Sequence, residues 1–213
     1  MANQEVDGDT VVAQSFSELA PVLIGLSNQV RYRSVMALNR ILAHTLALRD
    51  LYRKNHWQTS GATFYQLHLL FDKHHGEQDE LADAIAERVQ TLGGVALALA
   101  QDVVQETRVS RAPRGRETPV AELSELVSAH EMILMEARAL AREATDRGDD
   151  GTNDLHVSQV VRSNENQSWC VSEHLVLSNL PEARRRDCGA CGACRPERAP
   201  ISRSSPIGQS RYR

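Results

Sequence analysis

Hydrophobic residues recur at helical spacing along four long stretches of this chain. The first stretch starts between residues 27 and 34, and its stripe continues as far as His56 through Leu38, Ile41, Leu42, Thr45, Leu48 and Tyr52. The second covers residues 63–91, opens on a Thr-x-x-Gln capping pattern and stops at Gly93-Gly94. The third covers residues 118–147 with Pro119 in its first turn, and the fourth covers residues 152–178. This pattern predicts an all-α protein.

Shorter segments precede and join these helices. Residues 95–106 can form a short helix that crosses between the second and third long helices. Residues 108–116 are basic and contain Pro and Gly, so we expect a surface loop that either touches phosphate or is only solvated. Residues 15–25 form either a short helix broken at Pro21 or a loosely packed extension. We therefore expect a largely flexible extension over residues 1–29, a helical domain over residues 30–180 and a disordered basic tail, rich in Cys and Arg, over residues 181–213.

Composition and charge narrow the class of protein. The chain has 213 residues, few aromatic residues (4%) and a formal net charge of −4, so the whole molecule is not a basic nucleic-acid binder. No run of about 18 apolar residues occurs, so we expect no membrane span. No Lys or Arg precedes Arg31, which argues against a secretory signal. We expect a cytoplasmic protein, with association with the nucleoid as a further option.

A candidate metal site lies where the first two helices meet. His56 ends the first helix, a Ser- and Gly-containing turn follows, and His68 lies one to two turns into the second helix. In an antiparallel helical hairpin these two side chains lie at the same level and can face each other. Asp72 follows His68 by one turn on the same face. These three residues form one half of a site with metal-ligand chemistry.

Asp83 and Glu87 share that face of the second helix but lie far along it. Asp83 is fifteen positions past His68, which is roughly 22 Å along a helix axis. One chain cannot bring both groups to one metal, whereas two antiparallel copies of the helix can. The spacing therefore suggests a symmetric dimer with two identical sites. Imidazole and carboxylate ligands without thiolate suit iron, manganese or zinc, and the alternative is an ordinary solvated helix face.

A longer run of residues extends this pattern in order: His56-Trp57, Gly61, Phe64, Leu67-His68, Phe71-Asp72, Asp83, Ala86-Glu87-Arg88 and Leu92-Gly93-Gly94. In order and spacing this run resembles the Dps family, the DNA-binding proteins from starved cells or mini-ferritins, over residues 30–180. No Glu-x-x-His occurs, which argues against a larger ferritin or bacterioferritin.

The resemblance implies a ferritin-like four-helix bundle with a short crossing helix, assembled as a hollow homododecamer. It also implies ferroxidase centres that hold iron between subunits, with His56, His68 and Asp72 from one subunit and Asp83 and Glu87 from its partner. Such a centre oxidises Fe(II) with hydrogen peroxide, or more slowly with O2, and ferric mineral is stored in the shell. Zinc is a further occupant of the same donors. The competing reading is an architectural shell that binds the nucleoid and whose metal centre is slow or zinc-filled.

Residues near the proposed centre leave alternatives open. His75, with or without Asp79, lies on the ligand face and is either an additional metal ligand or a polar neighbour of the ligands. Trp57 either relays or quenches an electron or packs beside the site. Gly76 in the middle of the helix indicates close approach of another helix. Asp150 and Asp154 belong either to a plain polar turn or, as the resemblance implies, to pores that admit cations on the three-fold axes.

The C-terminal tail carries separate candidate sites. Residues 181–213 have a net charge of +5, so the rest of the chain carries −9. Arg184, Arg185 and Arg186 are the candidate DNA-binding residues, and twelve such arms would bind phosphate with avidity. Three further residues form a Cys-x-x-Cys-x-x-Cys pattern, which suggests a zinc or copper(I) thiolate site or a redox-active thiol pair, namely Cys188, Cys191 and Cys194. Cys170 is interpreted as a small core residue.

Overall fold

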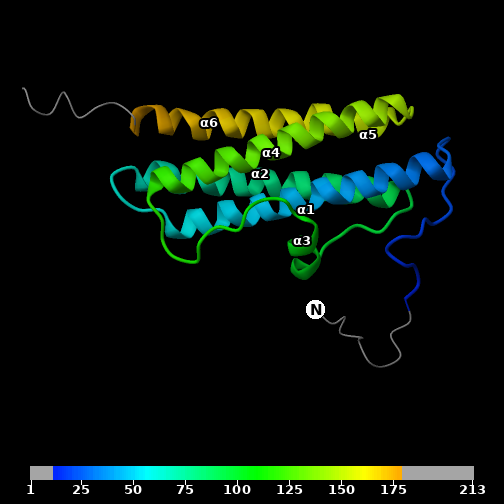
Figure 1. The fold of residues 1–213 in the computed structure, drawn as a ribbon, viewed down its shortest axis with the longest axis horizontal. Helices are drawn as coiled ribbons and strands as arrows, with labels where there is room; N and C mark the ends of the chain where they lie inside the picture. Colours follow the sequence, from blue (N-terminus) through cyan, green and yellow to red (C-terminus); the bar gives the residue numbers. More distant parts are fainter. Residues whose placement is uncertain (1–11, 179–213) are drawn as a thin grey trace, which may run out of the picture. The chain divides into compact units, whose positions relative to one another are not determined.

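Four long rods lie lengthwise beside one another in the computed structural model, which describes residues 12–178 (Figure 1). The first three rods are α1 (Asn28–Gln58), α2 (Phe64–Thr91) and α4 (Pro119–Asp146). The fourth runs without a break through α5 (Asp150–Asp154), the π-helical segment η1 (Leu155–Val161) and α6 (Arg162–Ser178). The short α3 (Ala100–Glu106) lies outside the bundle. The predicted ferritin-like bundle with its crossing helix is confirmed.

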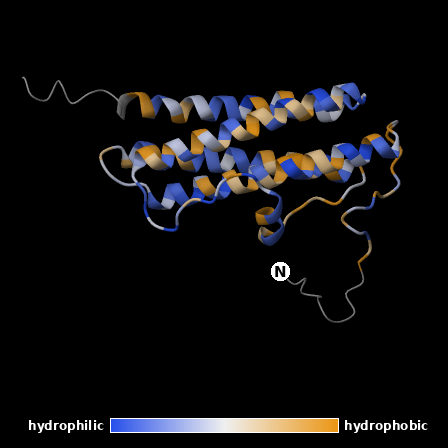
Figure 2. Cartoon of the chain, in the orientation of Figure 1, coloured by the Kyte–Doolittle hydropathy of each residue, from blue (hydrophilic) through white to orange (hydrophobic). Residues whose placement is uncertain are grey.

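Hydrophobic residues are interspersed with polar ones on every long helix, as in helices that bury one side (Figure 2). The stripe predicted on α1 forms the centre of the core, because Leu38, Ile41, Leu42, Leu48 and Tyr52 are all buried. The other rods bury their apolar sides against it with Phe71, Ile85, Leu126, Ile133, Val160 and Val171. None of the helices within residues 12–178 is long and apolar enough to cross a membrane.

Side-chain caps set the starts of two of the long helices. The hydroxyl of Ser27 accepts a hydrogen bond from the Val30 amide at the start of α1, and Thr118 caps α4 in the same way ahead of Pro119. The predicted capping box of α2 is wrong in its chemistry. Thr63 precedes that helix, but its side chain makes no cap bond. A tight turn at Gly61, where φ is +100°, starts α2 instead, with the Phe64 amide donating to the Gly61 carbonyl.

The Gly93-Gly94 stop of α2 is confirmed, and each glycine has its own reason. Gly93 adopts φ +80°, which disfavours other residues, and a Cβ there would lie 2.6 Å from the Ala20 carbonyl oxygen. A Cβ on Gly94 would lie 2.5 Å from the Val35 side chain, so this glycine lets the chain pass close to α1. Gly93 also holds the N-terminal extension, because the Ala20 amide donates to its carbonyl.

Two expected segments differ from the sequence interpretation. Residues 95–99 are not helical, because the Asn39 side chain satisfies their backbone: its amide donates to the Val95 carbonyl and its oxygen accepts from the Leu97 amide. Within residues 15–25 no helix forms, so the extension alternative holds there. Arg31 fixes this extension by donating from one guanidinium nitrogen to the carbonyls of Ala20 and Leu92. Cys170 is partly exposed on α6, so its placement in the core is wrong.

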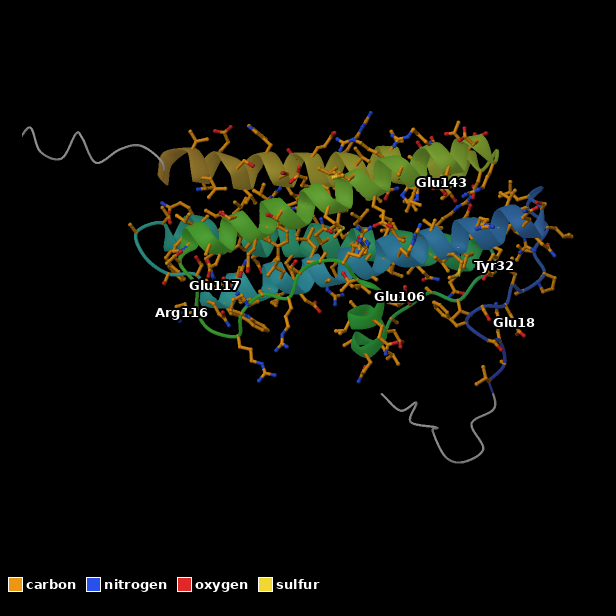
Figure 3. All side chains as sticks on the ribbon, viewed as in Figure 1. Glu18, Tyr32, Glu106, Arg116, Glu117 and Glu143 are labelled. Carbon is orange, nitrogen blue, oxygen red and sulfur yellow. The ribbon has the colours of Figure 1, made fainter. Side chains whose placement is uncertain are left out.

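The loop that follows α3 is tied back to the bundle at the hairpin end. Lys54 near the end of α1 forms an ion pair with Glu117, just ahead of α4. Figure 3 shows Glu117 beside Arg116 at that end of the bundle. The pair brings the C-terminal end of α1 and the N-terminal end of α4 together, beside the turn that joins α1 to α2.

Candidate metal centre

His56 and His68 hold each other across the α1–α2 hairpin. The Nδ1 atom of His56 lies 3.0 Å from the His68 carbonyl oxygen, and the Nδ1 atom of His68 lies 2.9 Å from the His56 carbonyl oxygen. The two rings stack with centroids 3.9 Å apart and planes at 19°. A carbonyl oxygen only accepts hydrogen bonds, so each Nδ1 carries the proton. Each Nε2 therefore presents its lone pair, which is the state that ligates a metal.

The hairpin itself creates this reciprocity. α1 ends at Gln58 and α2 begins at Phe64, so a short turn brings the last turn of one helix beside the first turns of the other. His56 is two residues from the end of α1, and its carbonyl, like that of His68, is accessible to the facing ring. Phe64 stacks on the other side of His68, with ring centroids 5.2 Å apart, and fixes that ring further.

Asp72 lies beside this pair, as predicted. Its Oδ1 atom is 3.8 Å from His56 Nδ1 and 3.5 Å from a guanidinium nitrogen of Arg53. The Asp72 side chain is 56% exposed, so its carboxylate is open to solvent or to a second subunit. The three residues that the sequence assigns to one half-site thus lie at the same end of the hairpin, although Asp72 approaches His56 at Nδ1 and the three side chains do not converge on one metal position in this protomer.

His75 and Asp79 are each engaged by an arginine of α1. Arg53 donates to His75 Nδ1 at 2.8 Å, which requires that nitrogen to be the unprotonated one. Burial, followed by the charge of Arg53, lowers the pKa of His75. Asp79 accepts from Arg49 at 3.0 Å. Because Arg53 also contacts Asp72, His75 is linked to the half-site through that arginine, which favours its role as a polar neighbour.

Asp83 and Glu87 lie one turn apart on the second half of α2, and both are exposed. α2 is a single helix from Phe64 to Thr91, so the separation of Asp83 from His68 remains roughly 22 Å along the axis. Within residues 12–178 of one chain, no three His, Cys, Asp or Glu side chains converge on a position that would hold a metal ion. The two halves of the predicted site are therefore apart in one protomer.

Arg88, next to Glu87, forms an ion pair with the buried Asp149 that helical spacing does not predict. Arg88 donates to Asp149 at 2.7 Å and to the Thr152 hydroxyl at 3.1 Å, and Ser34 donates to Asp149 at 2.5 Å. Burial alone would raise the pKa of Asp149, but the hydrogen bonds from Ser34 and Thr152 and the charge of Arg88 lower it. The signal was present in the sequence, since an arginine directly follows a ligand candidate, but its partner lies 61 positions away.

Asp149 connects this pair to the predicted pore residues. It caps α5 by accepting from the Thr152 amide. Asp150 and Asp154 follow, one turn apart, and both are exposed. The carboxylate of Asp149 is thus used inside the bundle, while its two neighbours in the acidic turn remain available to solvent.

Trp57 and Gly76 have few neighbours within one protomer. The Trp57 side chain is 69% exposed, and its ring contacts the Arg53 guanidinium, whose carbon lies 5.9 Å from the ring centroid. A Cβ on Gly76 would meet nothing within 4 Å, so the predicted close approach of a helix does not occur inside the chain. The tail residues Arg184, Arg185, Arg186, Cys188, Cys191 and Cys194 lie outside the described residues.

Comparison with known proteins agrees with this architecture. Residues 35–180 match the ferritin-like domain family. The chain is 50% identical to a protein of known structure, DpsC from Streptomyces coelicolor, over 80% of this chain and 98% of that one, with a TM-score of 0.78. It is 25% identical to the Vibrio cholerae DPS protein, described as a member of a broad superfamily of ferritin-like diiron-carboxylate proteins, over 74% of this chain and 98% of that one, with a TM-score of 0.69.

A DNA-binding relative extends the likeness. The nutrient stress-induced DNA-binding protein of a Synechococcus strain is 28% identical over 81% of this chain and 97% of its own length. The fold, the hairpin half-site and these matches lead to one conclusion, namely that the chain belongs to the Dps family of ferritin-like proteins.

Proposed function

We propose that this protein stores iron and oxidises Fe(II) at centres shared by two subunits of a hollow homododecamer. The observation that carries the proposal is the reciprocal pair of His56 and His68, which leaves both Nε2 lone pairs free, with the Asp72 carboxylate 3.8 Å from His56 Nδ1 at the same end of the hairpin. Two imidazoles and a carboxylate with open positions are a donor set suited to Fe(II). Asp83 and Glu87 of a second subunit would complete each centre.

Each residue has a distinct task in this scheme. Fe(II), the substrate, is bound by the two imidazole nitrogens and by Asp72, while Arg53 holds Asp72 and His75 in place. Glu87 from the second subunit supplies negative charge that favours the Fe(III) product over Fe(II). Hydrogen peroxide, or more slowly O2, accepts the electrons, and ferric mineral accumulates in the shell. Consumption of Fe(II) together with peroxide would protect DNA from oxidative damage.

We further propose that Asp150 and Asp154, which are both exposed, guide the substrate to the shell. Three copies of this pair around a three-fold axis would concentrate Fe(II) at a pore by focusing the electrostatic field. We expect the double variant Asp150→Ala, Asp154→Ala to take up Fe(II) more slowly at low salt and to approach the wild type at high salt. An equal rate at low salt would assign this acidic turn to structure alone.

The first experiment measures oxidation directly. Purified assembly is titrated anaerobically with Fe(II) and then pulsed with peroxide, and Fe(III) absorbance is followed. We expect rapid Fe(III) formation in the wild type and its loss in the double variant Asp83→Ala, Glu87→Ala. The exposed acid Glu131 provides a control, since Glu131→Ala lies on α4 away from the centre and should oxidise Fe(II) as the wild type does. Slow, equal oxidation in all three proteins would remove the ferroxidase proposal.

Mixed assemblies test whether the centre is shared. Subunits with His56→Ala and His68→Ala are reassembled with subunits that carry Asp83→Ala and Glu87→Ala. If each centre takes its ligands from two chains, random two-fold pairing restores about one quarter of the centres. If all ligands came from one chain, no mixture would recover activity. Zinc added before Fe(II) should block the recovered centres, because Zn(II) uses the same donors without redox chemistry.

A second candidate function rests on charge. The tail over residues 181–213 carries +5, whereas the rest of the chain carries −9, so DNA contacts would concentrate on the tail arginines. We expect the full chain to shift DNA in a gel at low salt and to release it as salt rises. Loss of binding on removal of residues 181–213 would assign the contact to the tail. If the full chain and the chain without residues 181–213 oxidise iron equally fast, DNA binding is independent of the metal centre.

A further inference from the structure

A buried chain of hydrogen bonds crosses the bundle core between α1, α2, α4 and α6 (Figure 1). The Tyr52 hydroxyl lies 2.6 Å from His130 Nε2 and 3.2 Å from His74 Nδ1. His130 Nδ1 lies 2.8 Å from the Asn164 side-chain oxygen. All four side chains are buried, yet none of them belongs to the metal centre described above.

The direction of these bonds follows from the outer end of the chain. The Asn164 amide nitrogen donates to the Val160 carbonyl at 2.8 Å, so its oxygen faces His130 and accepts from Nδ1–H. The other nitrogen of His130, Nε2, is then unprotonated and accepts the hydroxyl proton of Tyr52. The Tyr52 oxygen accepts in turn from Nδ1–H of His74. Each donor therefore points toward the next acceptor.

Burial keeps the central pair uncharged. It raises the pKa of Tyr52 well above 10, with smaller contributions from Cys170 and Glu77. It also lowers the pKa of His130 to about 4, against the opposing effect of Asn164. The pair at rest is a phenol whose proton points at a neutral imidazole. A phenol in an apolar core loses an electron easily only if its proton has a place to go, and His130 provides that place.

Tyr52 is also close to the proposed centre along the chain. It precedes His56 by one turn of α1, about 6 Å of helix rise. Its ring contacts Phe71, with centroids 6.0 Å apart, and Phe71 directly precedes Asp72. Tyr52 is thus one helical turn from the proposed ligand His56. One packed ring, that of Phe71, lies between it and the backbone of the proposed ligand Asp72.

We propose that Tyr52 is a redox-active residue that supplies the second electron when peroxide meets a centre holding only one Fe(II). This inference rests on the proposed function. Peroxide needs two electrons and two protons to become two water molecules. One electron comes from Fe(II), which becomes Fe(III), and the other comes from the Tyr52 phenol. The phenolic O–H bond breaks, its proton forms a new N–H bond at His130 Nε2, and the two protons for water come from solvent.

The cycle closes with the next substrate ion. A second Fe(II) gives one electron to the Tyr52 radical and becomes Fe(III), and the proton returns from His130 to the phenolic oxygen. His74 Nδ1–H and the protonated His130 both donate to that oxygen while the radical exists, which holds it in the core. A centre with one iron thereby avoids release of a one-electron oxidant, the hydroxyl radical, near DNA.

The test uses the full assembly loaded with less than one Fe(II) per centre. The protein is pulsed with peroxide, frozen within milliseconds and examined by electron paramagnetic resonance. We expect a tyrosyl signal in the wild type that narrows when the protein contains ring-deuterated tyrosine. Tyr52→Phe should lose the signal, and spin trapping should then detect more hydroxyl radical. Trp57→Phe, which alters the exposed aromatic residue beside His56, should keep the tyrosyl signal.

A positioning role for His130 has its own readout. His130→Gln leaves a hydrogen-bond acceptor but no base, so the radical should form more slowly. Its rate of formation should also no longer differ between H2O and D2O. Size-exclusion chromatography and circular dichroism establish that each variant assembles and folds. A tyrosyl signal that persists in Tyr52→Phe, or a signal that belongs to Trp57 in the wild type, would overturn the proposal.

Fe(III) absorbance in the same samples separates this idea from the proposed function. Fe(III) formation without a Tyr52 radical would overturn the redox role alone. If no Fe(III) forms in the wild type, metal-free protein is oxidised by a flash-generated ruthenium(III) complex instead. A tyrosyl signal that disappears in Tyr52→Phe would still support a redox-active Tyr52, and an equal signal in both proteins would refute it.

Discussion

The histidine pair at the hairpin end and the histidine pair in the bundle core are held by different partners. His56 and His68 each donate to a backbone carbonyl, which leaves both Nε2 atoms available at the surface. His74 and His130 both bond to the Tyr52 hydroxyl, and His130 is bonded at its second nitrogen as well. In His56, His68 and His130 an oxygen acceptor on Nδ1 leaves Nε2 unprotonated, so the group that Nε2 faces decides its role. An Nε2 without a partner within residues 12–178 is available to a metal, whereas the Nε2 of His130 faces the Tyr52 hydroxyl and can accept its proton.

The largest expected effect is a difference in the free energy of unfolding between a variant of the core and a variant of the hairpin pair. Tyr52→Ala removes a fully buried ring and leaves His74 Nδ1 and His130 Nε2 without their partner, so we expect a loss of about 3–5 kcal/mol in the free energy of unfolding. His56→Ala breaks hydrogen bonds at the edge of the bundle and should cost only about 1 kcal/mol. Urea denaturation followed by circular dichroism measures both. Equal losses would mean that the hairpin pair is as important to the fold as the core pair.

The second effect concerns pH and the buried histidines. Burial lowers the pKa of His130 and of His156 to about 4. The unfolded chain takes up these protons near pH 6.5, before the folded chain does, so stability is complete above that pH and is lost as pH falls toward 4. Each histidine should contribute a slope of at most about 1.4 kcal/mol per pH unit in this window.

His156 provides the cleanest variant for this measurement. Both of its ring nitrogens are buried without a hydrogen-bond partner, so His156→Leu removes a titrating group and breaks no bond. We expect the variant to lose less stability than the wild type between pH 7 and pH 5 in parallel urea titrations. Asp149 does not interfere, because its pKa is lowered from an ordinary value that already lies below this range. Parallel curves for the two proteins would contradict the assignment.

The comparison also shows how much of the structure can be predicted from the sequence. Helical spacing predicted the four long helices, because each buries one stripe, and hairpin logic placed His56 opposite His68. Helical spacing did not predict where α3 starts, since the Val95 carbonyl and the Leu97 amide are bonded by one side chain, Asn39, from α1. Periodicity identifies the face on which a residue lies, but not the atom that it meets.

The residues missed in the sequence share this limit. Tyr52 was assigned to the apolar stripe, which is correct for its ring, but its hydroxyl meets His130, 78 positions away. Asp149 directly precedes the two acids predicted for a polar turn or pore, yet it is buried against Arg88. Helical spacing does not single out Arg53, which contacts both Asp72 and His75. Long-range partners of polar atoms decide these roles, and they follow from packing rather than from spacing.

The smallest effect on stability tests the hairpin pair most sharply. His68→Asn keeps a donor near the position of Nδ1, so it can still bond to the His56 carbonyl, but it removes Nε2. We expect its free energy of unfolding to lie within about 0.5 kcal/mol of the wild type. Its affinity for Fe(II) or Zn(II), measured by anaerobic calorimetry, should fall about tenfold or more. His68→Gln reverses the design, because its amide reaches toward Nε2 and not toward Nδ1. A fall in stability without loss of affinity in His68→Asn would show that the ring orders the hairpin and does not bind metal.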